Sequence, residues 1–144
     1  MHDLGKIAIG DNILRKPGRL TDEEFAIMQG HAAKSGELVE SILGGVEEEY
    51  FVNLAKNVAR HHHEKWNGAG YPDHLKGEEI PMEARIMAIA DVYDALVSKR
   101  CYKEAMSFEQ AYKVMMESMG SHFDPQLEEV FVKSRDKLEA YYSE

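Results

Sequence analysis

The sequence contains one cysteine, Cys101, among its 144 residues, so no disulfide can form within a single chain. A lone thiol fits a protein that is kept in a reducing compartment, and we expect a cytoplasmic location. No nucleophile motif surrounds Cys101 in the sequence. We therefore do not expect this thiol to be catalytic.

Long apolar runs are also absent. No stretch approaches the roughly 20 apolar residues that a helix needs to cross a bilayer. The opening residues, Met1-His2-Asp3-Leu4, show no basic segment followed by an apolar one, which is the pattern of a signal peptide. We predict no membrane segment in this chain.

Positive charge is scarce, because 17 Lys and Arg residues stand against 26 Asp and Glu residues and the formal net charge is -9. A general binder of DNA or RNA needs a basic surface to replace the counterions around phosphates, so we predict no such partner. The charge does not exclude a small phosphate ester as ligand, since bound cations can dominate the local field.

Alternating strand patterns are missing as well, and the chain has helical periodicity instead. Thr21 and Glu24 form a capping box that predicts the start of a helix. The helix should run to about Leu43, where Gly44-Gly45 ends it. Its expected inward face recurs at steps of three and four residues: Phe25, Met28, Ala32, Ser35 and Val39.

A second helix is expected to end at His61-His62-His63, with Phe51, Ala55, Val58 and His62 on one face. The segment from residue 64 to residue 79 follows, rich in Gly, Pro and Asp and without a period. Loops of this length are usually functional or disordered. Its apolar side chains, Trp66, Tyr71 and Leu75, favour an ordered loop.

Three further helices are predicted in the second half of the chain. Pro81 suits the first turn of one that continues through residues 84–96. Ser107, with Gln110 three residues on, opens the next, which should end at Gly120. Asp124-Pro125 opens the last, which carries Leu127, Val130 and Phe131. We predict an all-α fold in which residues 1–144 form one domain.

Asp91 is the most informative single residue, because it stands in an otherwise apolar helical stretch and should be buried. A buried carboxylate is costly unless it is paired or binds a metal. An ion pair with Arg or Lys, or a cap on a helix end, remains the alternative to metal ligation.

Histidine supplies the other candidate ligands. We expect His31 on the inward side of the first long helix. It is either a histidine packed in the core or a metal ligand. At most two of the three consecutive histidines can converge on one centre, and we expect His61 to face elsewhere. His74 and His122 have no partner signal, and we interpret them as structural or surface residues. Imidazole and carboxylate together suit first-row transition metals and metal-assisted hydrolysis, although the spacing leaves their convergence open.

Several segments in order along the chain resemble the HD-GYP subgroup of the HD-domain metal-dependent phosphohydrolases. They are residues 2–7 (HDLGKI), 14–18 (LRKPG), 28–31 (MQGH), 62–72 (HHEKWNGAGYP), 89–96 (IADVYDAL), 98–103 (SKRCYK) and 123–125 (FDP). The resemblance implies an HD-domain bundle of about five or six helices with a long loop. It also implies hydrolysis of the bacterial second messenger cyclic di-GMP to the linear dinucleotide, to GMP, or to both.

The resemblance further implies two or three divalent transition metals, with iron or manganese expected. One metal would take His2, Asp3 and Asp91. A second would take Asp3, His31, His62 and His63, so that Asp3 bridges the two. Lys6 would contact the scissile phosphate and act together with Asp3 as a catalytic residue.

Substrate contacts are implied in two further places. Gly70, Tyr71 and Pro72 would shape the nucleotide pocket, and Arg100 and Lys103 would hold phosphates. Other interpretations stay open: Lys6 as a solvated lysine, Arg100 and Lys103 as caps on helix carbonyls, and Tyr71 as a ring packed over the core.

The sequence departs from the family pattern at Asn67 and Ala69, where Asp and Ser are usual, and at its start. In the family, helices that supply a further ligand precede the His-Asp pair, which stands here at positions 2 and 3. We therefore expect an N-terminally truncated domain with partial metal occupancy and little activity. We also expect exposed apolar surface that favours a homodimer, and a sensor or receiver domain upstream in the parent protein.

Two alternatives to cyclic di-GMP hydrolysis remain. One is an HD phosphohydrolase that acts on another nucleotide. The other is a non-catalytic module that binds cyclic di-GMP or a protein.

Overall fold

The computed structural model describes residues 2–99 and 104–143. The helices are α1 (Asp11–Leu14), α2 (Asp22–Leu43), α3 (Glu49–His61), α4 (Met82–Val97), α5 (Phe108–Glu117) and α6 (Glu128–Tyr142), with short 3₁₀ turns η1 (Leu4–Ala8), η2 (Gly77–Glu79) and η3 (Pro125–Leu127). The described residues contain no strand and only one isolated bridge, between Met119 and Phe123. The predicted all-α fold is confirmed.

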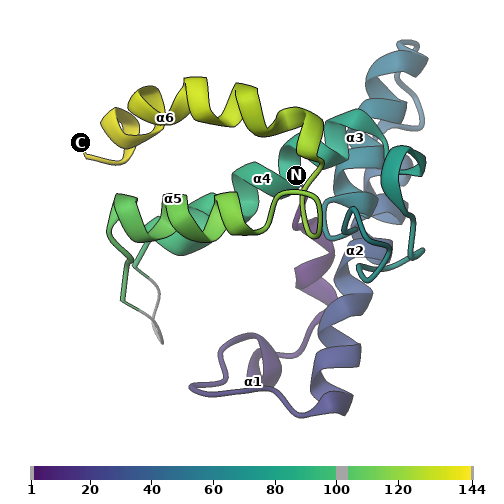
Figure 1. Ribbon diagram of the computed structural model, residues 1–144. Helices are drawn as coiled ribbons and strands as arrows, with labels where there is room; N and C mark the ends of the chain where they lie inside the picture. The colour runs from purple at the N-terminus through teal and green to yellow at the C-terminus, as the bar shows by residue number, and fades with distance from the viewer. Residues whose placement is uncertain (1, 100–103, 144) are drawn as a thin grey trace.

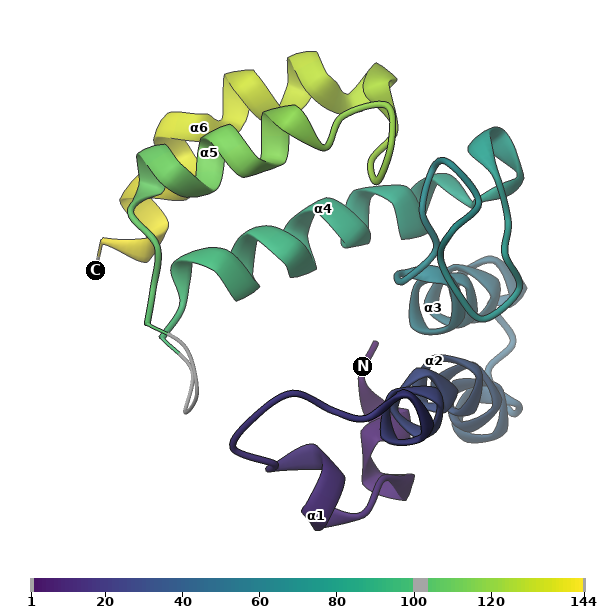
Figure 2. The same ribbon diagram turned by 60° about the horizontal axis from the view of Figure 1, so that its bottom comes forward.

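The helices form two groups (Figures 1 and 2). In one group α2 and α3 lie side by side, with η1 packed against α2. In the other group α4 packs against α5, and α6 lies beside them. Contacts between α3 and α4 connect the two groups, and the N-terminal segment ends in the space between them (Figure 2).

Each group has its own apolar core. The larger core joins α4, α5 and α6 through Ala88, Tyr93, Leu96, Ala111, Met115, Phe123 and Phe131. The smaller core lies between α2 and α3 and consists of Val39, Ala55 and Ala59, with Leu4 and Leu43 packed against it. The N-terminal segment therefore contributes to the smaller core through Leu4.

Local capping signals set the helix starts. Thr21 accepts a hydrogen bond from the Glu24 amide, and the Glu24 side chain accepts one from the Thr21 amide, so the predicted capping box is confirmed. Ser107 forms the equivalent box at the start of α5. The predicted end of α5 is wrong: the helix stops at Glu117, and Gly120 lies in the following turn with φ of 80°.

The expected inward faces are only partly correct. Phe25 and Phe51 are exposed, at 48% and 43% of their surface. The contact between α2 and α3 is made by small side chains, including Ala32 and Ala59, both 0% exposed. Phe25, at the start of α2, lies instead beside the Tyr71 ring of the loop after α3, with ring centroids 6.4 Å apart.

The loop after α3 is ordered, as predicted. The buried Glu64 carboxylate accepts hydrogen bonds from the backbone amides of Asp73 and Leu75, at 2.7 and 3.1 Å. The Trp66 amide donates to the carbonyl of His122 at 2.9 Å, which ties the loop to the segment before α6. In the described part of the chain, no helix combines the length and the apolar character of a membrane span.

Candidate metal centre

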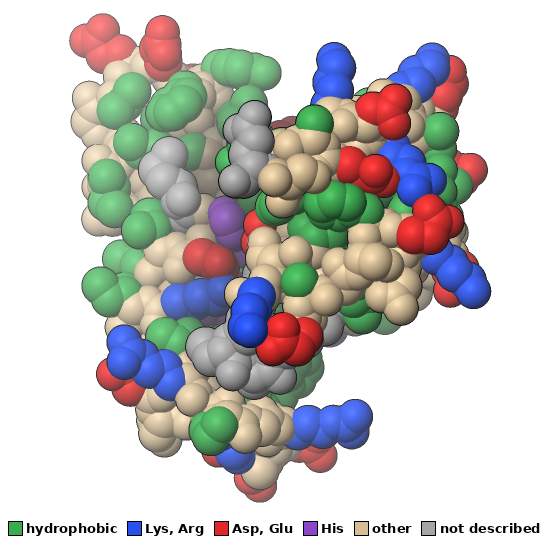
Figure 3. Space-filling view, turned by 90° about the vertical axis from the view of Figure 1, so that its left-hand side faces the viewer, with side chains coloured by type: hydrophobic (Ala, Val, Ile, Leu, Met, Phe, Trp, Pro, Cys, Tyr) green, Lys and Arg blue, Asp and Glu red, His purple; other side chains and the backbone are tan. Residues whose placement is uncertain are grey.

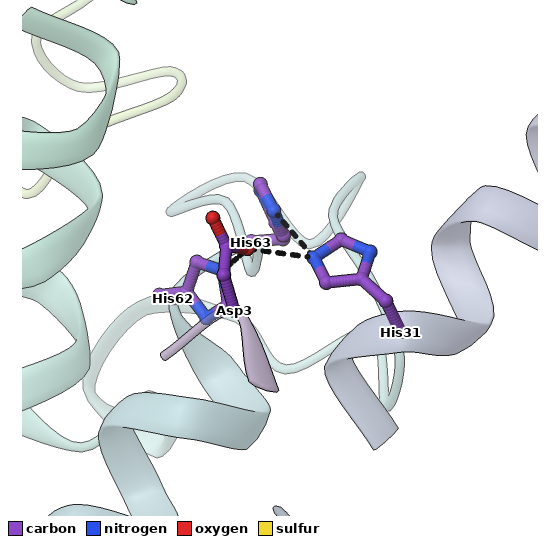
Figure 4. A group of neighbouring side chains, drawn as sticks. All are labelled: Asp3, His31, His62 and His63. Carbon is purple, nitrogen blue, oxygen red and sulfur yellow. Dashed lines mark hydrogen bonds and ion pairs between the residues drawn. The ribbon is translucent and has the colours of Figure 1, made fainter. Parts of the chain in front are cut away.

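Four side chains from distant parts of the sequence meet beside the N-terminal segment (Figure 4). One ligand atom from each of Asp3, His31, His62 and His63 lies within 4.8 Å of the others. Asp3 precedes η1, His31 projects from α2, and His62 and His63 follow the end of α3. His61 is not part of this group, as expected for the first of three consecutive histidines.

The contacts within the group are short. The Asp3 Oδ1 atom lies 3.4 Å from the Nε2 atom of His31 and 3.9 Å from the Nε2 atom of His62. The Nε2 atoms of His31 and His63 are 3.1 Å apart. Four potential ligand atoms therefore converge on one point.

Gly5 and Ser35 bring Asp3 to His31. The Gly5 amide donates a hydrogen bond of 2.7 Å to the Ser35 hydroxyl. A Cβ atom at Gly5 would lie 2.1 Å from the His31 carbonyl oxygen, so only glycine lets η1 lie this close to α2. Sequence reasoning placed Ser35 on the inward face, and no local signal in the sequence pairs it with Gly5.

The backbone fixes the orientation of two of the rings. The Nδ1 atom of His31 lies 2.5 Å from the Met28 carbonyl, and the Nδ1 atom of His62 lies 3.0 Å from the Val58 carbonyl. A carbonyl can only accept, so each Nδ1 carries the proton and donates it. The Nε2 atoms of both rings face the centre, where a neutral ring offers its lone pair to a metal ion.

Burial favours the neutral form of the His62 and His63 imidazoles. It lowers the pKa of His62 to about 4, with the positive charge of His2 adding to the effect. Burial and the neighbouring rings of His62 and His31 lower the pKa of His63 to about 3. Neutral imidazole is the form that binds a metal ion.

Two buried atoms without partners also indicate that these residues could hold a divalent cation. The Asp3 Oδ1 atom and the His62 Nε2 atom are buried and have no hydrogen-bond partner among the described residues. Buried polar atoms in proteins are nearly always satisfied, and a cation between these two atoms would satisfy both. Imidazole with carboxylate is a donor set suited to first-row transition metals.

His2 lies between two carboxylates. Its Nε2 atom is 3.3 Å from Asp3 Oδ2 and 3.6 Å from Asp91 Oδ1. Hydrogen bonds to Asp3 and Asp91 raise the pKa of His2 to about 9, so its imidazolium supplies positive charge there. The same contact with His2 lowers the pKa of the Asp91 carboxyl.

Asp91 is not buried, and in this respect the prediction is wrong. Its side chain is 25% exposed and lies outside the four-residue group, next to His2. Asp91 instead makes its charged contact with His2, which is itself 26% exposed, at a partly exposed position on α4. In the space-filling view a histidine side chain is visible in a recess between two parts of the surface, with acidic and basic side chains nearby (Figure 3).

The Asp3 carboxylate is the central charge of the site. Burial alone would raise its pKa, but the contacts of the carboxylate with His2, His31 and Lys6 outweigh burial and hold the pKa well below the usual range. The Lys6 ammonium lies 2.6 Å from Asp3 Oδ2. Lys6 is therefore at the centre and not merely solvated.

The Gly70-Tyr71-Pro72 segment borders the group. The Tyr71 ring stacks on the His63 ring, with centroids 4.9 Å apart and planes 24° apart. A Cβ atom at Gly70 would lie 2.3 Å from the Lys65 amide nitrogen, so this glycine permits a close approach within the loop itself. Arg100 and Lys103, the expected phosphate contacts, lie outside the described residues.

Residues 1–127 match a family model described as HD domain. The chain is 49% identical over 135 residues to a probable cyclic di-GMP phosphodiesterase of Vibrio cholerae serotype O1, which covers 92% of this chain and 30% of the relative. It is 38% identical over 142 residues to a cyclic di-GMP phosphodiesterase of Thermotoga maritima, covering 99% of this chain and 37% of the relative.

A third relative is named for a different substrate. It is a 3'3'-cGAMP-specific phosphodiesterase 2 of Vibrio cholerae, 44% identical over 138 residues, covering 96% of this chain and 26% of that protein. The chain thus spans well under half the length of the relatives that it matches.

Proposed function

This chain belongs to the HD-domain family, in its HD-GYP subgroup, and on that premise we propose that it hydrolyses cyclic di-GMP in a metal-dependent reaction. The observation that carries the proposal is the convergence of Asp3, His31, His62 and His63 within 4.8 Å. The reaction adds one water and breaks one P–O bond of the cyclic diester. It yields the linear dinucleotide, and a second hydrolysis would yield GMP.

We assign the ligands as two overlapping sets that share Asp3. The set Asp3, His31, His62 and His63 is supported by its short contacts and its unpartnered buried atoms. The set His2, Asp3 and Asp91 is supported by the two contacts of His2, which would exchange its proton for a metal ion. Iron or manganese suits both sets, and occupancy is expected to be higher in the first, which has more protein ligands.

The side chains around the centre have distinct tasks in this proposal. A bound divalent cation supplies Lewis acidity at the phosphoryl oxygens and an activated water near neutral pH. Asp3 holds negative charge at the centre. The Lys6 ammonium, 2.6 Å from Asp3, is placed to neutralise or protonate the leaving oxygen of the scissile phosphate.

We propose that the substrate lies across the loop of Gly70, Tyr71 and Pro72, with Arg100 and Lys103 as phosphate contacts. Tyr71 packs against His63, so it would orient that ligand as well as border the nucleotide. A second candidate substrate is 3'3'-cGAMP, which is supported by the 44% identity to the cGAMP-specific relative.

The wider setting is proposed as well. The chain spans 30% of one relative and 26% of another, so we expect the parent protein to carry an input domain that controls the activity. Large apolar side chains are exposed on several elements, including Ile7 at 87% and Tyr50 at 81%, and we propose that part of this surface is covered in a homodimer. The single cysteine favours a cytoplasmic location.

The test is hydrolysis by the purified parent protein that contains this chain, after anaerobic loading with Fe²⁺ or Mn²⁺, with products separated by chromatography. Cyclic di-GMP and 3'3'-cGAMP are compared side by side. Asp3→Asn should lower the rate by more than about 100-fold, because it removes the carboxylate shared by both ligand sets. Asp136→Asn is the matched control, since this exposed aspartate in α6 is far from the centre in the sequence, and it should stay within about twofold.

Equal rates for Asp3→Asn and the wild-type chain would contradict the proposal. Absence of hydrolysis of either dinucleotide by a folded, metal-loaded parent protein would favour the non-catalytic binding module instead. Preference for 3'3'-cGAMP would support the second candidate substrate.

A further inference from the structure

A second group of side chains that could hold a metal ion lies at the end of α3 and in the loop that follows it. One ligand atom from each of His61, Glu64 and Asp73 lies within 4.8 Å of the others. The His61 Nδ1 atom is 3.4 Å from Asp73 Oδ2 and 4.0 Å from Glu64 Oε1. This group shares no residue with the centre at Asp3.

The second group is about as compact as the first. At the Asp3 centre the corresponding separations are 3.4 and 3.9 Å, in a set that the family relationship connects with metal binding. Around a tetrahedral zinc ion with ligands at about 2.0–2.1 Å, neighbouring ligand atoms are roughly 3.3 Å apart. The His61–Asp73 separation of 3.4 Å is close to that value, and Glu64 would need to move about 0.7 Å closer to His61.

The surroundings of two side chains in this group, His61 and Glu64, favour a bound cation. The His61 Nδ1 atom is buried and has no hydrogen-bond partner among the described residues. The Glu64 side chain is 0% exposed, and its two hydrogen bonds come from uncharged backbone amides. A buried carboxylate without a close positive partner is costly, and a divalent cation would offset that cost.

Arg60 is compatible with such an ion. Its Nε and Nη2 atoms donate to Asp73 Oδ2 and Oδ1, both at 2.8 Å. A carboxylate oxygen has two lone pairs, so Asp73 Oδ2 can accept from Arg60 and still face His61. Arginine would then orient the ligand, as outer hydrogen-bonding partners commonly do in metal sites.

We propose that His61, Glu64 and Asp73 form a second, structural binding site for a divalent transition-metal ion of the Zn²⁺ type. The ion would join the last turn of α3 to the loop at Asp73. Because His62 and His63 stand between these points in the sequence, the site would hold the loop that presents them to the Asp3 centre. Mixed imidazole and carboxylate ligands suit Zn²⁺, Co²⁺ or Ni²⁺.

The test is to strip the chain with a chelator, add Zn²⁺ and count bound metal by mass spectrometry after desalting. His61→Gln should bind one equivalent less than the wild-type chain. His74→Gln is the matched control, because His74 is an exposed histidine of the same loop outside both groups, and it should bind the wild-type amount.

Anomalous scattering at the zinc edge locates the ions in crystals of the wild-type chain and does not depend on how the variants fold. A peak bounded by His61, Glu64 and Asp73, separate from any peak at Asp3, would support the proposal. It is overturned if zinc fills the Asp3 centre while no peak stands at His61. Equal zinc stoichiometry in folded His61→Gln and wild-type chains would overturn it too.

Discussion

Gly5 shows how a single missing methyl group sets the position of a ligand. Its backbone lies against α2, where a Cβ atom would be 2.1 Å from the His31 carbonyl oxygen and 2.7 Å from the Ser35 amide nitrogen. Gly5→Ala should push η1 away from α2 and separate Asp3 from His31. We expect a loss of roughly 1–3 kcal/mol of unfolding free energy and weaker metal binding, measured by urea unfolding and Mn²⁺ titration.

Gly30 in the same helix α2 provides the control. A Cβ atom there has nothing within 4 Å, and the residue is exposed. Gly30→Ala should raise the unfolding free energy by about 0.5–1 kcal/mol, because alanine loses less backbone entropy in a helix. If both variants changed stability equally, the close approach of Gly5 to α2 would not be the cause.

At the scale of residues, the sequence predicted the chemistry of the site better than its contacts. The residue types and the family resemblance selected His31, His62 and His63 as candidates, and the structure brings these side chains together with Asp3. The pairing of Gly5 with Ser35 spans 30 positions, so it depends on how η1 packs against α2. The contact of Asp91 with His2 likewise joins residues that are far apart in the sequence, so it depends on how distant segments pack.

At the scale of elements, the sequence predicted helix starts correctly where a capping box is present. The two capping boxes gave the starts of α2 and α5. The short elements η1 and α1, of 5 and 4 residues, carry too few side chains to show a period and were not predicted. The inward face of α3 was only partly identified. The predicted face included Ala55, which is buried, but it also included Phe51, which is exposed, and it missed the buried Ala59.

The ordered loop after α3 depends on a buried ion pair outside it. Arg85 of α4 donates to Asp124 Oδ2 at 2.8 Å and to the Ile80 carbonyl at 2.7 Å. Asp124 has a fully buried side chain and also caps η3 through the Gln126 amide. The Arg85 guanidinium lies 5.8 Å from the centre of the Trp66 ring, which belongs to the loop.

Asp124→Ala should therefore cost about 3–5 kcal/mol of unfolding free energy, since it leaves the Arg85 charge buried and unpaired. Urea unfolding measures the change. Glu129→Ala is the control, because Glu129 forms an exposed pair with Lys133 within α6 and should change stability by less than about 1 kcal/mol. A cost for Asp124→Ala no larger than the control's would show that the pair does not support the fold.

At the scale of the whole molecule, the Asp3 centre bridges two structural groups with separate cores. The cores of α2–α3 and of α4–α6 share no residue. The proposed ligands come from the N-terminal segment, from α2, from the end of α3 and, through Asp91, from α4. A bound metal would thus restrain segments that apolar packing alone connects mainly where α3 meets α4.

Metal removal should therefore lower the thermal stability of the whole chain. A ligand at 100 times its Kd stabilises the native state by about 2.7 kcal/mol, which corresponds to roughly 5–10 °C in Tm for a chain of this size. We expect this difference between chains with Mn²⁺ and with chelator, measured by calorimetry. Both samples use the His61→Gln variant, so that an ion at the second site does not contribute to the difference in Tm. Adding Asp3→Asn should abolish most of the shift, because it removes the carboxylate that both ligand sets share, and an undiminished shift would mean that the stabilising ion binds elsewhere.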